Sequence, residues 1–368
     1  MKIAVLAHIR HAIAEPFSGG MEAHCAGLCD GLRVAGHDVT LFAAAGSRDA
    51  NLVEICADPY ETVLPWSLYR GSDILSAYQK SAFERAQAHI EAGDFDVVHN
   101  NSLHPGVIAW AADAGIPCVT SQHVPPFGSM ADAVGEAAPY AHVQFTVTSG
   151  SQLDLWSSPC RTNMRVVPNG VDCERWQPVD SCGEYLTWIG RIVPNKGLAQ
   201  AVAAARIANV PMRIFGPIED VSYFADRVEP LLSGGLEYHG HARAADLVPV
   251  LAASNGAVVT PMWDEPFGLV AAEALACGVP VIAFDRGAMR EVIGPCGIVV
   301  DGGDVGALAK AMGRIHTIDR AACRERALRD LSVSAMIAGY EKCYADAIDH
   351  AAAAPLAGPA AGPVAAAA

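Results

Sequence analysis

Two glutamates in the second half of the chain have a spacing that suits binding to two parts of one ligand. Glu265 and Glu273 lie in the run DEPFGLVAAEALACGVPVIA, and we predict a helix that Pro266, Phe267 and Gly268 open and that carries Glu273 two turns in. The free N–H groups at such a helix start suit a phosphate, and Gly268 lets a ligand approach closely. Glu273, deeper along the same face, can then accept hydrogen bonds from ribose hydroxyls.

Two basic residues lie in the run WIGRIVPNKG. A predicted strand ends in Gly190 and Arg191, and a turn then brings Lys196 in front of Gly197 and the next helix. An arginine and a lysine on one loop can converge on a diphosphate. Lysine and arginine are scarce in this chain, with 25 in total, which favours a functional role for this pair.

A pair of glycines follows the first predicted strand, in the run PFSGGMEAHCAGL. Gly19 and Gly20 lie just before an expected helix over residues 20–36, and adjacent glycines permit close backbone approach to a ligand. We expect the N–H group of Gly20 to contact a phosphate that is bound mainly by the other half of the chain. Glu22 is expected to cap or orient the helix.

The composition is typical of a globular protein of two domains. Of 368 residues, 52% are hydrophobic and 18% are charged, and the net charge of −15 argues against a nucleic-acid groove. Eleven cysteines without Cys-x-x-Cys pairs indicate a reducing compartment, so we expect a cytoplasmic protein. We expect no integral membrane segment, because no run approaches 18 uncharged apolar residues; peripheral membrane contact stays open.

Short apolar runs alternate with helical patterns in two series, which predicts an α/β protein with two Rossmann-like, doubly wound parallel sheets facing a central cleft. The turn-rich run over residues 167–183 is interpreted as an interdomain link. We expect an N-terminal acceptor domain over residues 1–175 and a C-terminal donor domain over residues 176–332. A C-terminal helix is expected over residues 333–349, and the Ala/Pro/Gly-rich residues 350–368 are expected to be disordered.

The run around Glu265 and Glu273 resembles the signature of the family-4 retaining glycosyltransferases of GT-B fold. The glutamate spacing, the intervening Phe-Gly and the following Ala-Cys-Gly-Val-Pro-Val-Ile all match, which outweighs the simpler interpretation of two exposed helix residues. The Arg191–Lys196 loop and the Gly-Gly-x-Glu turn match the same family. The resemblance covers residues 1 to about 345, is strongest over residues 165–300, and implies that the C-terminal helix crosses back to the first domain.

The resemblance also implies roles for particular residues. Glu265 would face the donor sugar, Glu273 would hold the ribose, and the two basic residues would neutralise the charge on the leaving diphosphate. His123, at the end of CVTSQH, would lie beside the donor sugar, whereas His99 is interpreted as a structural residue. The implied catalytic residues are His123, Glu265, Arg191 and Lys196, and the implied donor-binding residues are Gly19, Gly20, Arg191, Lys196, Gly216, Pro217, His241, Phe267, Gly268, Leu269, Val270 and Glu273.

No set of candidate metal ligands has a workable spacing, so we predict no metal and no cofactor besides the donor. His239 and His241 are expected to share a strand face, but two histidines without a third ligand make a poor metal site. We interpret them as structural or as neighbours of the nucleotide base. Asp94 and Asp96 have the Asp-x-Asp form of metal-dependent glycosyltransferases of another fold, yet they precede a strand and are better explained as a turn cap.

The expected function is retaining transfer of a sugar from a nucleotide diphosphate donor, of UDP or GDP type, to a hydroxyl of a glycan, lipid-linked sugar or small metabolite. No carboxylate is clearly placed as a nucleophile in the first domain, which favours departure and attack on the same face of the sugar. Residues 10–18 and 57–80, where the family usually meets its acceptor, match nothing. A sugar-nucleotide epimerase and a noncatalytic nucleotide-sugar-binding module are the alternatives.

Overall fold

A computed structural model of the protein describes residues 1–180 and 182–353 and contains two parallel β-sheets, one in each half of the chain. The strand order reverses between β1 and β4, which makes the first sheet doubly wound. Residues Ile3 to Leu6 of β1 are fully buried, because helices cover both faces of this sheet. The first sheet has the order β3 (Leu52–Cys56), β2 (Asp38–Ala44), β1 (Lys2–Ala7), β4 (Val97–Asn101), β5 (Cys118–Gln122), β6 (Val143–Val147) and β7 (Met164–Val166).

The first helix of the first domain is shorter than predicted, and residues 66–92 form two helices. Gly71, with a φ of 75°, lies between α3 and α4. The first helix ends at Val34 rather than at residue 36, where Gly36 has a φ of 89°. The helices are α1 (Gly20–Val34), α2 (Tyr60–Val63), α3 (Trp66–Tyr69), α4 (Asp73–Glu91), α5 (Pro105–Ala114), α6 (Gly128–Ala137) and α7 (Gly150–Leu153).

The second sheet is also parallel and doubly wound, with six strands. Its order is β10 (Leu236–Tyr238), β9 (Met212–Phe215), β8 (Leu186–Ile189), β11 (Gly256–Val259), β12 (Val281–Asp285) and β13 (Gly297–Asp301). The surrounding helices are α8 (Leu198–Ala208), α9 (Val221–Tyr223), α10 (Ala244–Ala252), α11 (Leu269–Ala276), α12 (Met289–Ile293), α13 (Val305–Met312) and α14 (Arg320–Asp330). The predicted fold class, two doubly wound α/β domains, is therefore confirmed.

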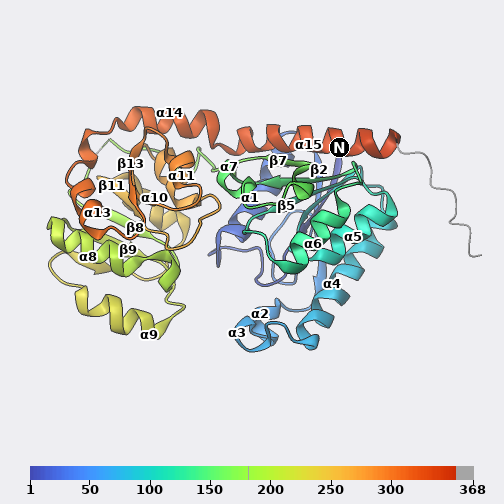
Figure 1. Ribbon diagram of the computed structural model, residues 1–368, viewed down its shortest axis with the longest axis horizontal. Helices are drawn as coiled ribbons and strands as arrows, with labels where there is room; N and C mark the ends of the chain where they lie inside the picture. Colours follow the sequence, from blue (N-terminus) through green and yellow to red (C-terminus); the bar gives the residue numbers. More distant parts are fainter. Residues whose placement is uncertain (181, 354–368) are drawn as a thin grey trace, which may run out of the picture.

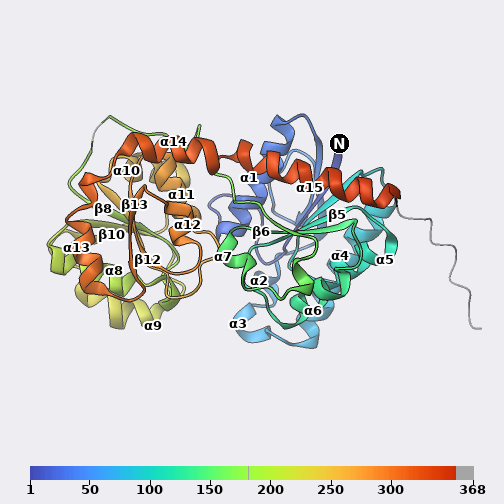
Figure 2. The same ribbon diagram turned by 45° about the horizontal axis from the view of Figure 1, so that its top comes forward.

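Two consecutive helices near the C-terminus run along one edge of the molecule, one over each domain (Figure 1). Figure 1 shows α14 over the second domain and α15 (Val333–Ala353) over the first, and the turned view of Figure 2 shows the same two helices crossing both domains. Tyr340 and Tyr344 of α15 are fully buried against the first domain. The helix continues to Ala353, so residues 350–353 of the expected disordered tail are helical, since alanine is the best helix former. Residues 354–368 of that tail lie outside the described residues.

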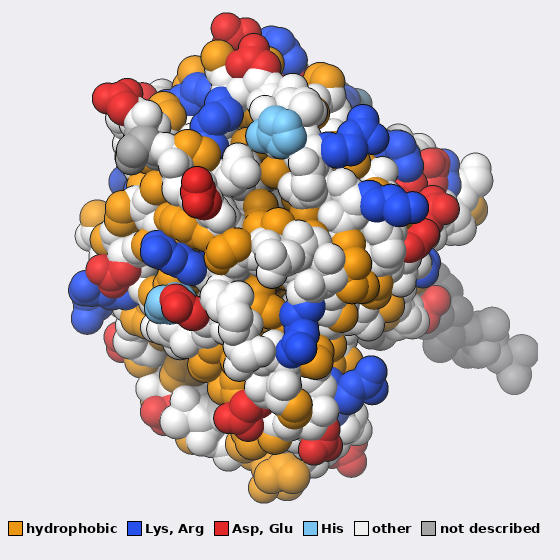
Figure 3. Space-filling view, turned by 90° about the vertical axis from the view of Figure 1, so that its left-hand side faces the viewer, with side chains coloured by type: hydrophobic (Ala, Val, Ile, Leu, Met, Phe, Trp, Pro, Cys, Tyr) orange, Lys and Arg blue, Asp and Glu red, His pale blue; other side chains and the backbone are white. Residues whose placement is uncertain are grey.

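The outer face of the second domain carries side chains of both charges (Figure 3). Figure 3, which views the outer end of the second domain, shows acidic, basic and apolar side chains intermixed over that face. In the part of the chain that the structure describes, no helix is both long and apolar enough to cross a membrane. All eleven cysteines are free thiols.

Candidate active site

A cleft of about 1060 Å³ lies between the two domains and is lined by both of them. Loops at the carboxyl ends of the parallel strands form its walls, as expected for open α/β sheets. This volume lies at the upper end of the range that is usual for small-molecule binding sites. Every residue that the sequence predicted for the site lines this cleft: Gly19, Gly20, His123, Arg191, Lys196, Gly216, Pro217, His241, Glu265, Phe267, Gly268, Leu269, Val270 and Glu273.

The N-termini of two helices, one from each domain, face the same part of the cleft. A Cβ atom at Gly20 would lie 3.0 Å from Leu269 Cδ1, so the starts of α1 and α11 nearly touch. Gly19 and Gly268 are the N-cap residues, and neither has a side chain that could cap the free N–H groups. Two helix N-termini, each with partial positive charge and free donors, favour an anion between them.

The start of α11 differs in detail from the prediction. Gly268 has a φ of 87° and is not helical, so the helix begins at Leu269 and Glu273 lies on its second turn rather than two turns in. A Cβ atom at Gly268 would lie 2.3 Å from Met289 Cε. The backbone conformation at this position therefore favours glycine, whereas the end of the flexible Met289 side chain could shift to make room for a Cβ atom.

Glu265 and Lys196 form an ion pair at the floor of the cleft. Lys196 Nζ lies 2.5 Å from Glu265 Oε2, and this oxygen also accepts a hydrogen bond of 2.9 Å from Trp263 Nε1. The lysine side chain is 24% exposed and that of the glutamate 13%. Trp263, which the sequence did not single out, thus fixes Glu265 through one carboxylate oxygen and leaves the second oxygen for a ligand.

Arg191 and Lys196 both line the cleft, but each pairs with a different carboxylate. Arg191 Nη1 lies 2.8 Å from Glu219 Oε2, and this pair is more exposed than the pair of Lys196 and Glu265. The sequence predicted the two cations but missed Glu219, because a lone glutamate after a strand carries no distinctive pattern. Gly216 brings the end of β9 against β8, since a Cβ atom there would lie 1.8 Å from Gly190 O.

Glu273 of α11 lies in the wall of the cleft and is only partly exposed. Burial raises the pKa of its carboxyl group to about 7, and the nearby positive charge of Arg175 opposes this increase. Arg175 itself lies 2.6 Å from Glu15 of the first domain through its Nη1 atom. Arg175 stabilises the charged form of this carboxylate only in part. A ligand that donates hydrogen bonds to the carboxylate would therefore stabilise its charged form further.

His123 lies at the end of β5, on the first-domain side of the cleft. Its Nε2 atom donates a hydrogen bond of 2.9 Å to Asn101 Oδ1, which leaves Nδ1 as an acceptor in the neutral ring. Burial keeps the pKa of His123 well below its usual value, so the ring is neutral near pH 7. The ring of His24, which the sequence did not single out, lies against it with a centroid distance of 4.3 Å.

The other candidate residues have structural surroundings. His99 is fully buried, and its Nε2 lies 2.9 Å from Ser121 Oγ, in agreement with the structural interpretation. Glu22 does not cap α1 but pairs with His8 Nε2 at 3.2 Å, because Gly19 places the helix start next to the end of β1. His239 and His241 do not share a strand face, since β10 ends at Tyr238.

The first and second domains are connected by hydrogen bonds next to Glu265. Thr148 Oγ1 and Ser149 Oγ both donate to the carbonyl oxygen of Pro266, at 2.9 and 2.8 Å. Glu291 of α12 accepts hydrogen bonds from the N–H group of Gly150 at 3.0 and 2.9 Å and so caps α7 of the first domain. These contacts hold the loop that carries Glu265 against the first domain.

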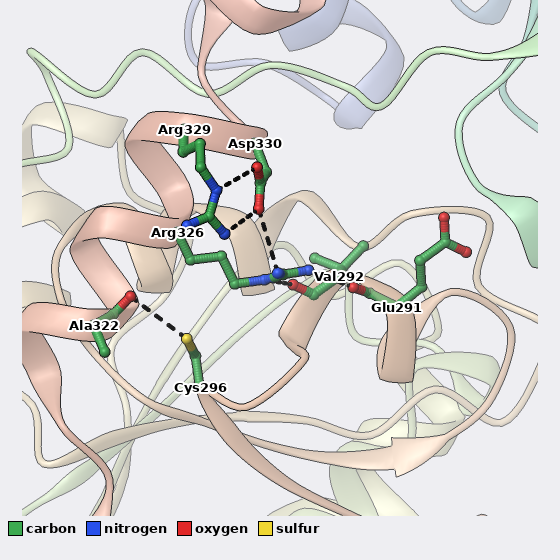
Figure 4. A network of polar contacts seen from close by, with 7 residues as sticks. All are labelled: Glu291, Val292, Cys296, Ala322, Arg326, Arg329 and Asp330. Atoms are coloured by element: carbon green, nitrogen blue, oxygen red, sulfur yellow. Dashed lines mark hydrogen bonds and ion pairs between the residues drawn. The ribbon is translucent and has the colours of Figure 1, made fainter.

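The position of α12 is fixed in turn by α14, as Figure 4 shows. Arg326 Nε donates to the carbonyl oxygen of Val292 at 3.0 Å, and Arg326 Nη2 donates to that of Glu291 at 2.6 Å. Asp330 pairs with Arg326 at 3.4 Å and with Arg329 at 2.7 Å. No sequence pattern indicates this support, because the contacts join residues far apart in the chain.

Among the described residues, no group of three or more His, Cys, Asp or Glu side chains is arranged to hold a metal ion. Asp96 Oδ2 accepts a hydrogen bond of 2.7 Å from the backbone N–H of Lys2, which fits the interpretation of the Asp-x-Asp run as a turn element.

Two protein-family models match the two halves of the chain. The model for Glycosyltransferase Family 4 matches residues 18–175, and the model for Glycosyl transferases group 1 matches residues 183–317. The D-inositol 3-phosphate glycosyltransferase of Acidothermus cellulolyticus is 29% identical, over 81% of this chain and 78% of its own length. A glycogen synthase of Mycobacterium tuberculosis is 26% identical, over 84% of this chain and 85% of its own.

Solved structures share the fold over nearly the whole chain. The sucrose-phosphate synthase of Thermosynechococcus elongatus superimposes with a TM-score of 0.76 at 22% identity, over 94% of this chain and 98% of its own. HepE of Anabaena, in complex with UDP and glucose, has a TM-score of 0.67 at 17% identity, over 94% of this chain and 99% of its own. With both halves matched in order and the cleft between them, the chain belongs to the family-4 glycosyltransferases and has the GT-B fold.

Proposed function

We propose that the protein is a retaining, metal-independent glycosyltransferase that uses a nucleotide diphosphate sugar of UDP or GDP type. The observation that carries this proposal is the position of Glu265 and Lys196, which form an ion pair beside the facing N-termini of α1 and α11. One small region thus offers a carboxylate for sugar hydroxyls, a cation, and two sets of free N–H groups for phosphate. The solved structure of HepE with UDP and glucose supports a donor of this class.

The donor spans the second domain in this proposal. Its ribose meets Glu273, and its diphosphate meets the start of α11 together with Arg191 and Lys196. Arg191 can exchange Glu219 for phosphate oxygens, and Lys196 can keep its pair with Glu265 while another of its three N–H donors contacts a phosphate oxygen. Positive charge at this place stabilises the diphosphate as it leaves, an effect commonly worth about 3–4 kcal/mol for one well-placed donor.

The groups that flank the transferred sugar support the proposed retention of its configuration. Glu265 is paired with Lys196 and Trp263, so it suits the orientation of a sugar hydroxyl better than attack on the anomeric carbon. His123 is neutral, and its Nδ1 atom can accept a hydrogen bond from the sugar. The acceptor then attacks the face that the diphosphate leaves, and a leaving phosphate oxygen takes the proton of the acceptor hydroxyl.

The first test is a thermal-shift panel of UDP, GDP, ADP and dTDP with their sugars. A ligand that binds only the native state raises the melting temperature by mass action, so one or two nucleotides should stand out. Incubation with the stabilising sugar nucleotide alone separates transfer from epimerisation. Slow hydrolysis of the donor supports the proposal, whereas conversion to an epimeric sugar nucleotide would show that the protein is an epimerase.

A further inference from the structure

Two arginines of the first domain face the cleft, and the proposed donor site uses neither of them. Arg10 follows β1 and Arg70 follows α3, and both line the cleft together with Trp66. The guanidinium carbons of Arg10 and Arg70 lie 5.9 and 5.6 Å from the ring centroid of Trp66. Both guanidinium groups therefore make cation–π contacts with the indole ring, on the wall of the cleft opposite the donor domain.

The local structure orients these guanidinium groups. Glu61 Oε2 accepts a hydrogen bond of 2.9 Å from Arg10 Nε and another of 3.3 Å from the backbone N–H of Trp66. Within residues 1–180 and 182–353, the Nη atoms of Arg10 have no hydrogen-bond partner, and the guanidinium of Arg70 has neither hydrogen bond nor ion pair. The N–H donors of both groups are thus available to a ligand.

One arginine on this wall has no carboxylate partner. Glu61 pairs with Arg10 at 2.9 Å and Glu15 pairs with Arg175 at 2.6 Å, whereas Glu22 lies 3.2 Å from His8, which compensates its charge only when the ring is protonated. Among the residues that the structure describes, Arg70 is left as an uncompensated positive charge, although the chain has a net charge of −15. The donor diphosphate would be matched by Arg191 and Lys196 of the other domain, so Arg10 and Arg70 are free to bind a second anionic group.

We propose that the acceptor carries an anionic group, a phosphate or a carboxylate, and that Arg10 and Arg70 bind it. This inference rests on the proposed function and names the chemical class of the acceptor. Guanidinium groups present paired N–H donors that match the oxygens of such anions better than a lysine does. Ser76 and Gln79 of α4 also line the cleft and can bind the neutral part of the acceptor.

The same anion can come from a soluble sugar derivative or from the headgroup of a phospholipid. Figure 1 shows α2 and α3 at the edge of the first domain away from α15. Leu68 on α3 and Ile74 at the start of α4 are 78% and 62% exposed, and they flank Arg70 in sequence. The experiment therefore includes a lipid arm as well as soluble probes.

The test measures binding to the full chain saturated with the nucleoside diphosphate that stabilises it, which fills the donor site. Calorimetry with glucose 6-phosphate, glucuronate and glucose should show at least tenfold tighter binding of an anionic sugar than of glucose. Flotation with vesicles of phosphatidylcholine, with and without phosphatidylinositol, forms the lipid arm. Preference for the soluble anion or for the anionic vesicle identifies the source, and either one supports the inference.

Variants test whether the two arginines cause the preference for an anionic probe. Arg70→Gln should lower the affinity for the preferred anion at least tenfold, and Arg10→Lys should lower it less because it keeps the charge. Arg48→Gln is the matched control, since Arg48 is an exposed arginine of the first domain outside the cleft. Equal binding of anionic and neutral probes, or an equal loss in Arg48→Gln, overturns the inference.

Failure of the inference can be told apart from failure of the proposed function. The wild-type protein is assayed in parallel for nucleoside diphosphate binding and for donor hydrolysis. If both are present while no probe shows a preference for negative charge, only the anionic acceptor is wrong. If Arg70→Gln weakens nucleoside diphosphate binding as strongly as anion binding, the arginine belongs to the donor site, and the inference is also wrong.

Discussion

Replacement of Glu273 by glutamine should stabilise the protein and weaken its ligand binding at the same time. Burial raises the pKa of this carboxyl group from 4.5 to about 7. A pKa difference of one between two states corresponds to about 1.4 kcal/mol, so ionisation of Glu273 in the folded state costs about 3 kcal/mol relative to the unfolded chain above pH 7. Glutamine has nearly the same shape and carries no charge, and the variant avoids this cost.

The sign of the effect follows from the direction in which burial moves the pKa. The folded-state pKa lies above the unfolded value. The cost of ionising Glu273 is therefore absent below pH 4.5, where the carboxyl group is protonated in both states, and the wild-type protein loses stability as the pH rises through 7. Urea unfolding at pH 8.5 should therefore show Glu273→Gln more stable by up to about 3 kcal/mol. At pH 4.5 the two proteins should be nearly equal. Glu325→Gln, an exposed position on α14, is the matched control.

The same variant should bind the nucleoside diphosphate more weakly, because a ribose hydroxyl bound to a carboxylate loses a charged partner. Hydrogen bonds to charged groups contribute about 1.5–3 kcal/mol, which corresponds to a loss of roughly tenfold to a hundredfold. In the wild-type protein the affinity should rise with pH through 7, and this dependence should be absent from the variant. A variant no more stable at pH 8.5, or one with unchanged nucleotide affinity, would refute the assignment of Glu273.

The remaining predictions concern the other groups of the cleft. Glu265→Gln should preserve binding of the free nucleoside diphosphate by calorimetry and lower turnover, because it contacts only the transferred sugar; loss of nucleotide affinity would contradict this. Arg191→Ala and Lys196→Ala should each lower turnover roughly tenfold to a thousandfold, and near-normal rates in both would remove the diphosphate assignment. Thr148→Val with Ser149→Ala leaves the Pro266 carbonyl without its donors, so steady-state kinetics should show lower turnover at saturating donor, whereas unchanged kinetics would mean that the contact is dispensable. EDTA should change activity by less than about twofold, and activity that is lost and then restored by manganese would show a metal requirement.

The sequence predicted the fold class and the residues of the second-domain wall because both depend on local patterns. Buried strands such as β1 form continuous apolar runs in the sequence, and the loops that carry Arg191, Lys196 and Glu265 lie where strands end. The helix that Pro266, Phe267 and Gly268 were predicted to open begins at Leu269, because Gly268 has a left-handed conformation and is the N-cap, so Glu273 lies nearer the helix start than predicted. The sequence identified Gly268 as a close-approach residue, but its φ could not be inferred from its neighbours.

Contacts between distant segments could not be predicted. Glu219 gains its role from Arg191, and the neighbouring residues Trp263 and Glu265 gain theirs where the fold brings Lys196 to them. Glu22 was expected to cap or orient α1; it does not cap the helix, and its pairing with His8 was not predicted because His8 belongs to another element. Pairing of this kind depends on the geometry of the whole domain, which local sequence patterns do not contain.

The configuration of the transferred sugar tests the central claim most directly. The wild-type protein is incubated with an α-linked UDP- or GDP-sugar selected by thermal shift and with hydroxyl acceptors that include the anionic sugars. The one-bond C–H coupling of the new anomeric centre is then measured by NMR. Retaining transfer predicts an α-linked product formed together with the nucleoside diphosphate. A β-linked product, or an epimerised donor without any transfer, would contradict it.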